Sequence, residues 1–502
     1  MPVETLRDII RHGAEAYGAE AAFRYKVKKE IVDRSYQDVN RDSMSVSRMV
    51  ESMGMGGKHI ALIGTTTYQW IVGYFGIVGS GSVAVPIDAQ LPADAVCGLL
   101  DRADVEMLIF DEIRRDVAEA VREKCPRVRQ IISIQAAEPG DGIQSLSMQM
   151  AIHTGEYETA IDPDQVCTIL FTSGTTGKSK GVMLSHRNLV DNAVCLDMKI
   201  PAGTVSMTLL PINHVYCLTM DIIKGLYIGL VICINDSIMH VQKNMKLFKP
   251  EIVLLVPLVI ESIYGKLRDA GNLMPKEMVA KAAFGGNLKT ICSGGAYLDP
   301  DYVERFKEYG ITILQGYGMT ECSPVISTNL EWDHKTGSVG KLLPNCEAKI
   351  VDEEIWVRGT SVMQGYYKMQ EETDQALEDG WLKTGDLGYV DEDNFLYITG
   401  RRKNLIILSN GENVSPEELE NQLSRSDLVK EVLVREKDKV IEAEIFPDYE
   451  YARKRHVKDI EGGLRELIDE FNKDMPVYKR IYSLIVREAE FEKTPSKKIK
   501  RF

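Results

Sequence analysis

The stretch that decides the fold reads Thr172-Ser173-Gly174-Thr175-Thr176-Gly177-Lys178-Ser179-Lys180-Gly181. Its glycines let the backbone turn amide groups toward an anion, its hydroxyl groups add donors, and its lysines add positive charge. A buried strand is expected just before it, at residues 166–171, and a second strand just after it, at residues 181–186. The sequence therefore predicts a strand–loop–strand hairpin that holds a triphosphate and closes over it.

A P-loop is the alternative for this stretch, because Gly177-Lys178-Ser179 fits the end of the pattern G-x-x-x-x-G-K-[ST]. The first glycine of that pattern, however, falls on Thr172. A P-loop must also open a helix whose N-terminus holds the phosphates, whereas residues 181–186 are typical of a strand. These two mismatches exclude the P-loop.

The sequence on both sides of this loop alternates short apolar runs with helical segments. Buried strands are expected at residues 59–64, 83–86, 106–110, 251–256, 290–292 and 311–314, and helices at residues 68–77 and 111–124. Short apolar runs separated by helices imply crossover units and largely parallel sheets. One parallel sheet would not use the first 300 residues, so we expect an α/β fold with two parallel-type sheet subdomains.

The pattern of expected strands and turns changes near residue 337. Short strands split by glycine and acidic turns are expected at residues 348–352, 354–358, 388–390 and 395–399, which predicts a small distorted β-barrel over about residues 337–400. After Gly400-Arg401-Arg402-Lys403 the chain becomes charged, as in a small, mobile α+β domain. We therefore expect a large domain over residues 1–402 and a C-terminal lid over residues 403–502.

Composition limits the classes of function. The chain has 502 residues, of which 44% are hydrophobic and 27% are charged, and this balance excludes a disordered chain. The formal net charge is −14, so a broad electrostatic attraction to nucleic acid or to an anionic membrane is disfavoured. A polyanionic substrate is still compatible with this charge if a local cluster of positive groups holds it.

Cysteine usage and hydropathy indicate the compartment. The nine cysteines form no C-x-x-C pair, and an odd number in a long chain favours a reduced, intracellular protein. The first residues lack the basic start and apolar core of a signal peptide. The longest apolar stretches, residues 225–234 and 252–260, fall short of the ~20 residues that span a bilayer. The expectation is a cytoplasmic protein with no transmembrane segment.

Two further glycine-rich motifs follow expected strands. They read Ser293-Gly294-Gly295-Ala296 and Gln315-Gly316-Tyr317-Gly318-Met319-Thr320-Glu321. Ligands of open parallel sheets bind beyond the carboxyl ends of the strands, where glycine allows a close approach of the backbone. Tyr317 offers a flat face to a base, and Glu321 offers a hard oxygen to Mg²⁺.

Together these motifs resemble those of the adenylate-forming (AMP-binding) enzymes, the superfamily of acyl-CoA synthetases, carrier-protein adenylation domains and luciferases. The resemblance also covers Lys383-Thr384-Gly385-Asp386 and Gly400-Arg401-Arg402-Lys403, extends from about Leu6 to Arg501, and is strongest for the long-chain fatty acid–CoA ligase type. The family usually has proline where Ser179 stands, and we do not expect this difference to affect ATP binding.

The resemblance implies ATP, Mg²⁺ and CoA as ligands, and it assigns roles to residues. The implied nucleotide contacts come from the loop (Thr172, Ser173, Gly174, Thr175, Thr176, Gly177 and Lys180), from the two glycine-rich motifs (Gly294, Gly295, Ala296, Gln315, Gly316, Tyr317, Gly318 and Thr320) and from Asp386, Arg401 and Lys498. Adenine would pack between residues 294–296 and Tyr317, and Asp386 and Arg401 would contact ribose. Lys403 would be the hinge, Gly411 would line the CoA channel, and Glu321 would bind the metal.

The catalytic set implied by the resemblance is Lys498, Glu321, Thr320 and Lys180. Two alignments of the C-terminal motif are possible, and they assign the catalytic lysine differently. Aligning Ile499 and Arg501 with the family pattern S-G-K-I-x-R puts Lys498 on the catalytic position. Lys497 stands where the family has glycine, so Lys497 remains the alternative.

The class of acid substrate is indicated by Pro211-Ile212-Asn213-His214-Val215-Tyr216. This segment resembles the border of the acyl site in fatty acyl-CoA synthetases. His214, Tyr216, Gly316 and Gly318 are the expected substrate contacts. The apolar residues that follow Tyr216 suit an aliphatic chain, although a core helix explains most of them equally well. The F-D pattern that relatives use for an amino acid substrate is missing.

Three functions remain open at this point. The first is an acyl-CoA ligase for a medium- or long-chain fatty acid, with the acid, ATP and CoA as partners. The second is an adenylating enzyme that loads the phosphopantetheine of a carrier protein. The third is a non-catalytic nucleotide-binding protein on the same fold, which the combined presence of Lys180, Glu321, Asp386, Arg401 and Lys498 disfavours.

Overall fold

The computed structural model describes residues 2–135, 143–172, 179–271, 275–408, 412–493 and 499–501. The chain divides into two compact units. Unit 1 comprises Met1–Ala348 and Val357–Leu382, and unit 2 comprises Lys349–Trp356 and Lys383–Phe502. Each unit is described by itself.

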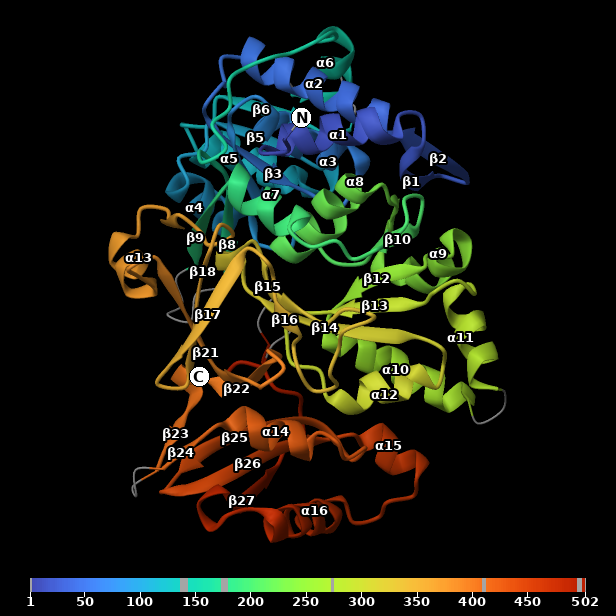
Figure 1. Ribbon diagram of the computed structural model, residues 1–502, viewed down its shortest axis with the longest axis vertical. Coiled ribbons are helices and arrows are strands. Elements are labelled where there is room, and N and C mark those ends of the chain that lie inside the picture. The colour runs from blue at the N-terminus through green and yellow to red at the C-terminus, as the bar shows by residue number, and fades with distance from the viewer. Residues whose placement is uncertain are drawn as a thin grey trace. The chain divides into compact units, whose positions relative to one another are not determined.

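The first sheet of unit 1 has eight strands in the order β19-β9-β8-β4-β3-β5-β6-β7. Pairing is parallel from β8 to β7, and β9 and β19 add antiparallel pairs at one edge. The central strands are apolar throughout because helices cover both faces of a parallel sheet (Figure 1). The strands are β3 (His59–Ile63), β4 (Val83–Ile87), β5 (Met107–Phe110), β6 (Gln130–Ser133), β7 (Gln144–Ser145), β8 (Val166–Thr172), β9 (Lys180–Ser185) and β19 (Gly365–Tyr366).

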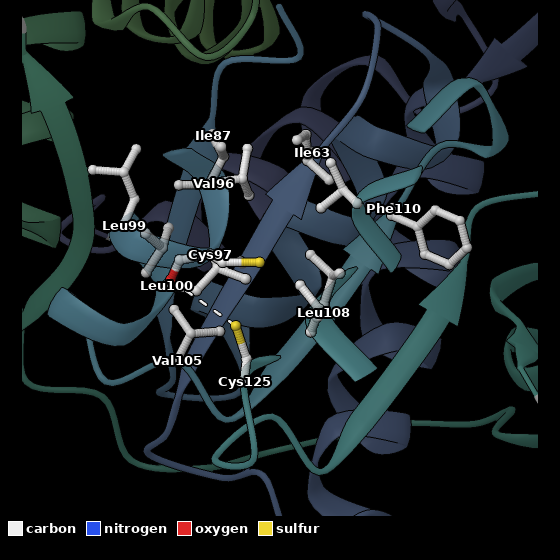
Figure 2. Close-up of a cluster of buried hydrophobic side chains, with 14 of the residues drawn as sticks. Ile63, Ile87, Val96, Cys97, Leu99, Leu100, Val105, Leu108, Phe110 and Cys125 are labelled. Carbon is white, nitrogen blue, oxygen red and sulfur yellow. Dashed lines mark hydrogen bonds between the residues drawn. The ribbon is translucent and has the colours of Figure 1, made fainter. Parts of the chain in front are cut away.

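One face of this sheet packs against helices α4 (Ala93–Arg102) and α5 (Arg115–Lys124). Figure 2 shows this cluster, with Ile63, Leu108 and Phe110 from the strands and Val96, Leu99 and Leu100 from α4. The Cys125 thiol contacts the Cys97 carbonyl oxygen at 4.0 Å, and both cysteines are buried. All nine cysteines are free thiols.

The second sheet of unit 1 has nine strands in the order β16-β15-β14-β13-β12-β10-β11-β1-β2. Its centre is parallel, from β14 through β12 and β10 to β1, and both edges are antiparallel. The strands are β1 (Ala21–Val27), β2 (Glu30–Ser35), β10 (Val205–Thr208), β11 (Val231–Ile234), β12 (Ile252–Leu255), β13 (Thr290–Ser293), β14 (Thr312–Gly318), β15 (Val325–Thr328) and β16 (Lys341–Leu342). The prediction of two α/β sheet subdomains is confirmed, with mixed rather than purely parallel edges.

Helices connect these strands, as expected for crossover units. Besides α4 and α5, unit 1 contains α1 (Leu6–Tyr17), α2 (Tyr36–Ser52), α3 (Tyr68–Gly79), α6 (Leu146–Ile152), α7 (His186–Val194), α8 (Lys224–Ile228), α9 (Val241–Phe248), α10 (Pro257–Gly271), α11 (Lys276–Phe284), α12 (Pro300–Lys307), α13 (Gln370–Ala376), the π-helix η2 (Tyr216–Ile223) and the 3₁₀-helices η1 (Glu112–Arg114), η3 (Ile238–His240) and η4 (Thr320–Cys322). In the described part of the chain, no helix combines the length and the hydrophobicity needed to cross a bilayer.

A five-stranded sheet forms the small barrel-like subdomain expected over about residues 337–400. Its strands run in the order β17-β18-β21-β20, and β22 also pairs with β21. The antiparallel pairs of β21 with β20 and β22 fit the glycine-rich and acidic turns of this segment. The strands are β17 (Cys346–Val351), β18 (Glu354–Gly359), β20 (Leu377–Glu378), β21 (Trp381–Val390) and β22 (Leu396–Arg401).

The C-terminal part of unit 2 is a small α+β fold, as expected. A three-stranded sheet in the order β25-β26-β27 and a two-stranded sheet of β23 and β24 share one core with the helices. The elements are η5 (Arg402–Asn404), β23 (Ile406–Ile407), β24 (Asn413–Val414), α14 (Pro416–Leu423), β25 (Val429–Lys437), β26 (Val440–Pro447), α15 (Tyr449–Lys454), α16 (Ile460–Asp474), η6 (Val477–Lys479) and β27 (Ile481–Val486).

Two local expectations need correction. The strand expected at residues 311–314 is longer, because β14 continues through Gly318 and pairs with β15. The strand expected at 181–186 ends one residue earlier, because Ser185 caps α7: its hydroxyl accepts from the Asn188 amide, and the Asn188 side chain accepts from the Ser185 amide.

Candidate functional site

The predicted hairpin is formed by β8 and β9. The strands pair antiparallel, with Phe171 opposite Gly181 and Thr172 opposite Lys180. The loop contacts implied by the family resemblance include Ser173, Gly174, Thr175, Thr176 and Gly177, and these residues lie outside the described ranges. Thr172 and Lys180 are both half-buried at the two ends of the loop.

Ser179 ties the two ends of this loop together. Its hydroxyl group donates to the Thr172 carbonyl oxygen at 2.9 Å. Arg102, the last residue of α4, donates to the Ser179 carbonyl oxygen and lies over the Phe171 ring, 5.6 Å from its centroid. Where the family usually has proline, this chain thus has a serine held by a hydrogen bond across the hairpin.

Lys180 and Glu321 lie on either side of one tyrosine, Tyr366. The Lys180 ammonium nitrogen is 4.6 Å from the centroid of the Tyr366 ring. The Tyr366 hydroxyl donates to Oε1 of Glu321 at 2.9 Å. The structure therefore brings together two predicted site residues from different motifs, and it does so through a third residue that the sequence did not single out.

The sheet register explains why Tyr366 lies there. Tyr366 pairs with Val182 on β9, so it shares a face of the sheet with Val182 and, two residues earlier, with Lys180. On the other side, the Met363 amide donates to the Glu321 carbonyl oxygen at 2.8 Å, which ties η4 to the same segment. Gly365 has a φ of +130°, a conformation that L side chains rarely adopt.

The motif after β13 contacts Tyr216, one of the predicted substrate residues. A Cβ atom at Gly294 would lie 3.1 Å from Cζ of Tyr216, and the Tyr216 hydroxyl donates to the Cys292 carbonyl oxygen at 3.2 Å. Gly295 and Ala296 are exposed. Glycine at position 294 therefore permits the tyrosine ring to lie flat against the backbone at the end of β13.

The second glycine-rich motif is a strand rather than a loop. The side-chain Nε2 of Gln315 donates to the Leu298 carbonyl oxygen at 2.9 Å, and Tyr317 is half-buried. A Cβ atom at Gly318 would lie only 2.0 Å from the Pro324 carbonyl oxygen, and one at Gly316 would lie 3.2 Å from the Ser327 carbonyl oxygen. The close approach that these glycines permit is thus to the neighbouring strand β15, which is a structural reason independent of any ligand.

Thr320 and Glu321 follow that strand in η4. Glu321 is 9% exposed, and Thr320 is half-buried. In contrast, the substrate candidate His214 is exposed, in the turn that precedes η2. The apolar residues after Tyr216, namely Leu218, Ile222, Ile223 and Leu226, are at most 1% exposed, so they belong to the core.

A second group of predicted residues lies in unit 2. Asp386 is 4% exposed and forms an ion pair with Arg401, its partner across β21 and β22, at 2.7 Å. The Asp386 amide donates to Oγ1 of Thr384, whose hydroxyl donates to the Ile355 carbonyl oxygen. Partial burial and the neighbouring Arg401 guanidinium lower the pKa of Lys403, two residues further on.

Gly411, Lys497 and Lys498 lie outside the described residues. The residues that flank the two lysines are anchored on unit 2. Lys493 and Ile499 form an isolated antiparallel bridge, and the Arg501 guanidinium donates to Oε1 of Glu420 at 2.8 Å. Burial raises the pKa of Glu420 to about 7, with Arg501 opposing the shift.

The residues present fit Mg²⁺ and ATP. No group of three or more His, Cys, Asp or Glu side chains suited to a metal occurs in the described part of the chain. Mg²⁺ is commonly bound by one or two carboxylates together with substrate phosphates and waters, and Glu321 can supply such a carboxylate. Among the described residues, no donor is bonded to its second oxygen, Oε2, so this oxygen is open to a cation.

The family called AMP-binding enzyme matches residues 10–367, and the family called AMP-binding enzyme C-terminal domain matches residues 403–502. The chain belongs to the AMP-binding enzyme family. The resemblance drawn from the motifs is thereby confirmed. This member combines the family's two matched regions in one chain.

Curated relatives of this AMP-binding enzyme are named as acid–thiol ligases. A long-chain-fatty-acid–CoA ligase of Bacillus subtilis (strain 168) is 27% identical over 483 residues, which cover 86% of this chain and 83% of that protein. Long-chain-fatty-acid–CoA ligase FadD15 of Mycobacterium bovis is 28% identical over 463 residues, which cover 82% and 77%. The chain is thus an enzyme of the AMP-forming acid–CoA ligase family.

Solved structures share the fold. The anthranilate CoA ligase AuaEII in complex with anthranoyl-AMP superimposes with a TM-score of 0.85 at 22% identity, over 99% of this chain and 96% of that one. O-succinylbenzoate coenzyme A synthetase from Bacillus subtilis, in complex with ATP and magnesium ion, gives a TM-score of 0.77 at 24% identity, over 98% of each chain.

Tyr366 is the residue of this region that the sequence reasoning missed. It follows Gly365 in a short segment, Met363-Gln364-Gly365-Tyr366-Tyr367, whose composition gives no sign of a site. Only the pairing of β19 with β9 places its ring beside Lys180. The signal is therefore the sheet register, and a single sequence does not contain it.

Proposed function

We propose that this AMP-binding enzyme activates a medium- or long-chain fatty acid with ATP and transfers the acyl group to CoA. In the first step a carboxylate oxygen attacks the α-phosphorus of ATP, the bond to the bridging oxygen breaks, and pyrophosphate leaves. In the second step the CoA thiol attacks the acyl carbon of the adenylate, AMP leaves, and the thiol proton is released.

The observation that carries this proposal is the arrangement of Lys180, Tyr366 and Glu321 in unit 1. A cation and a carboxylate with an open oxygen suit a triphosphate and its Mg²⁺. When bound, Mg²⁺ would offset negative charge on the phosphates. Glu321 would hold it, and Lys180 and Thr320 would bind phosphate oxygens.

The remaining roles are proposed on the family resemblance. Asp386 and Arg401 would bind the ribose, residues 294–296 and Tyr317 would enclose adenine, and Lys498 would stabilise the charge that develops on the α-phosphate. The cross-strand pair of Asp386 and Arg401 supports the ribose assignment, because it fixes a buried carboxylate that can accept two hydrogen bonds.

The class of acid rests on the relatives. Two of them are named as long-chain-fatty-acid–CoA ligases, whereas Leu218, Ile222, Ile223 and Leu226, which follow Tyr216, are buried in the core. The test is pyrophosphate release from ATP with a panel of straight-chain, aryl and dicarboxylic acids, with and without CoA, and detection of the thioester by mass spectrometry. We expect the highest kcat/KM for straight-chain acids. Release that requires an aryl or dicarboxylic acid would contradict the proposed substrate.

The catalytic lysine is tested by a matched pair of variants. We predict that Lys498→Ala lowers adenylate formation by about 10²–10³-fold, the usual loss when one group that stabilises transition-state charge is removed. Lys497→Ala should stay within about threefold of the wild type, since this lysine has no role in the reaction under the assignment to Lys498. The reverse result would move the catalytic role to Lys497, and wild-type rates in both variants would remove it from this segment.

A carrier protein is the second candidate for the acyl acceptor. A relative named long-chain-fatty-acid–[acyl-carrier-protein] ligase AEE15 of Arabidopsis thaliana is 26% identical over 575 aligned positions, which cover 92% of this chain and 78% of that protein. A mass gain on a phosphopantetheine-bearing carrier, with none on CoA, would select this acceptor.

A further inference from the structure

Tyr366 is a buried tyrosine whose hydroxyl group and ring face each contact a proposed site residue. It is 7% exposed, its hydroxyl donates to Glu321, and its ring faces the Lys180 ammonium group. The two contacts use different parts of the side chain, the hydroxyl group and the π face. A single residue therefore links the proposed metal ligand to the proposed phosphate-binding lysine.

The hydroxyl contact fixes how Glu321 presents its carboxylate. A phenol carries a proton and an ionised carboxylate can only accept, so the Tyr366 hydroxyl is the donor in this contact. A hydrogen bond to a charged acceptor is stronger than one between neutral groups. With Oε1 engaged by Tyr366, the carboxylate can present Oε2 to a cation.

The ring contact constrains Lys180. A lysine side chain is flexible and loses conformational entropy when it is held in one place. A cation over an aromatic face is attracted by the ring quadrupole, and this attraction is stronger where water is partly excluded. Lys180 is half-buried, so the Tyr366 ring holds its ammonium group at the end of the loop before any phosphate binds.

We infer that Tyr366 is a positioning residue that orients Glu321 for Mg²⁺ and Lys180 for the triphosphate, and that couples the two. This inference rests on the proposed function, because it takes the roles of Glu321 and Lys180 from it. It adds Tyr366 to the residues that support the reaction. It also explains how binding of the metal ion and binding of the phosphates can be coupled.

Two substitutions distinguish the effect of the hydroxyl contact from the effect of the ring contact. Tyr366→Phe removes the hydroxyl group and keeps the ring, whereas Tyr366→Leu removes both. We expect Tyr366→Phe to raise the Mg²⁺ concentration for half-maximal pyrophosphate release about five- to tenfold, which lies within the range for one lost intramolecular hydrogen bond. Tyr366→Leu should show the same change and, in addition, an ATP affinity about three- to fivefold lower.

The neighbouring residue provides the control. The Tyr367 hydroxyl donates to Oδ2 of Asp104 at 2.7 Å and contacts neither Lys180 nor Glu321 among the described hydrogen bonds. Tyr367→Phe therefore loses one hydrogen bond to a carboxylate in the same segment, and its Mg²⁺ dependence should be that of the wild type. Thermal unfolding of all three variants reports whether the fold is kept.

Binding is measured independently of turnover. Mn²⁺ replaces Mg²⁺, and electron paramagnetic resonance with a non-hydrolysable ATP analogue gives the Kd of the metal in the complex. We expect Tyr366→Phe to raise this Kd five- to tenfold. In Glu321→Gln the further substitution Tyr366→Phe should change the Kd less than twofold, since the tyrosine acts through the glutamate. Equal effects of Tyr366→Phe in both backgrounds, or no effect in the wild type, would overturn the inference.

The outcome also separates the inference from the proposed function. A wild-type chain that binds Mn²⁺ with the analogue, responds to Tyr366→Phe, and yet forms no thioester with any acid would contradict the function and support the inference. A chain that forms acyl-CoA while Tyr366→Phe leaves both the Mg²⁺ dependence and the Mn²⁺ Kd unchanged would do the opposite.

Discussion

Asp221 carries a carboxyl group that the fold encloses in the π-helix η2. The residue is 1% exposed, and neither of its side-chain oxygens has a hydrogen-bond partner among the described residues. The titratable groups that face it are Tyr216, Cys217 and Cys292. An ionised carboxylate without partners is costly in such surroundings, and burial raises the pKa of Asp221 to about 8 from its ordinary value of 3.8.

This residue predicts a pH dependence of stability. Between about pH 4 and pH 8 the unfolded chain releases the Asp221 proton while the folded chain keeps it, so the free energy of unfolding falls as the pH rises through this range. Asp221→Asn stays neutral at every pH and removes that loss, which is on the order of a few kcal/mol. We expect the Tm of Asp221→Asn relative to the wild type to increase from pH 5 to pH 9.

The control for this prediction is Glu15→Gln, which neutralises an exposed carboxylate on α1. Its Tm difference from the wild type should change little between pH 5 and pH 9. A constant difference for Asp221→Asn as well would mean that the Asp221 carboxyl is ionised in the folded chain.

At the scale of elements, the β8–β9 hairpin is closed at its base by side chains. Ser179 bonds across the hairpin to Thr172, and Arg102 holds the Ser179 carbonyl oxygen while it covers the Phe171 ring. A proline at this position would restrict the backbone directly by fixing φ near −65°. The serine achieves a similar restriction with a hydrogen bond, which water can compete with.

Two substitutions at Ser179 test whether the base of the hairpin matters for ATP. Ser179→Ala removes the bond to Thr172, and we expect the KM for ATP to rise about threefold with kcat nearly unchanged, since a typical hydrogen bond contributes about 0.5–1.5 kcal/mol. Ser179→Pro should keep the wild-type KM. An unchanged KM in Ser179→Ala, or a raised one in Ser179→Pro, would show that the loop does not depend on this constraint.

At the scale of the whole molecule, the residues proposed to bind ATP are distributed over both units. Lys180, Glu321 and Tyr366 belong to unit 1, and Asp386, Arg401 and Lys403 belong to unit 2. A chain with a net charge of −14 offers no long-range attraction to ATP, so binding depends on these local cations. A boundary at residue 402, with rotation of a C-terminal lid about Lys403 between the two half-reactions, remains our proposal for how one chain performs both steps.

Lys403 allows this rotation to be tested. Lys403→Pro restricts the backbone at the proposed hinge, whereas Lys403→Ala removes only the side chain. We expect Lys403→Pro to keep pyrophosphate release within about threefold and to lower thioester formation at least about tenfold, as for a gated second step. Lys403→Ala should retain both activities. Equal losses of both half-reactions in Lys403→Pro would contradict a hinge at this residue.

The amino-acid sequence is enough to predict the α/β class, the two sheet subdomains, the hairpin around residues 172–181 and the family. These features are readable because each depends on residues close together in the chain: apolar runs that form strands, a glycine- and hydroxyl-rich loop, and motifs in a fixed order. The extension of β14 through Gly318 could not be predicted from the sequence, because it depends on pairing with β15.

Which side chains of these motifs contact one another depends on the three-dimensional fold. Tyr366 lies beside Lys180 because β19 pairs with β9 in one register, and it reaches Glu321 because the Met363 amide binds the backbone of η4. Asp221 looks like an ordinary polar residue in the sequence and becomes a buried, unpartnered carboxyl only when η2 packs into the core. Contacts between distant segments depend on register and packing, and a local pattern of residues encodes neither by itself.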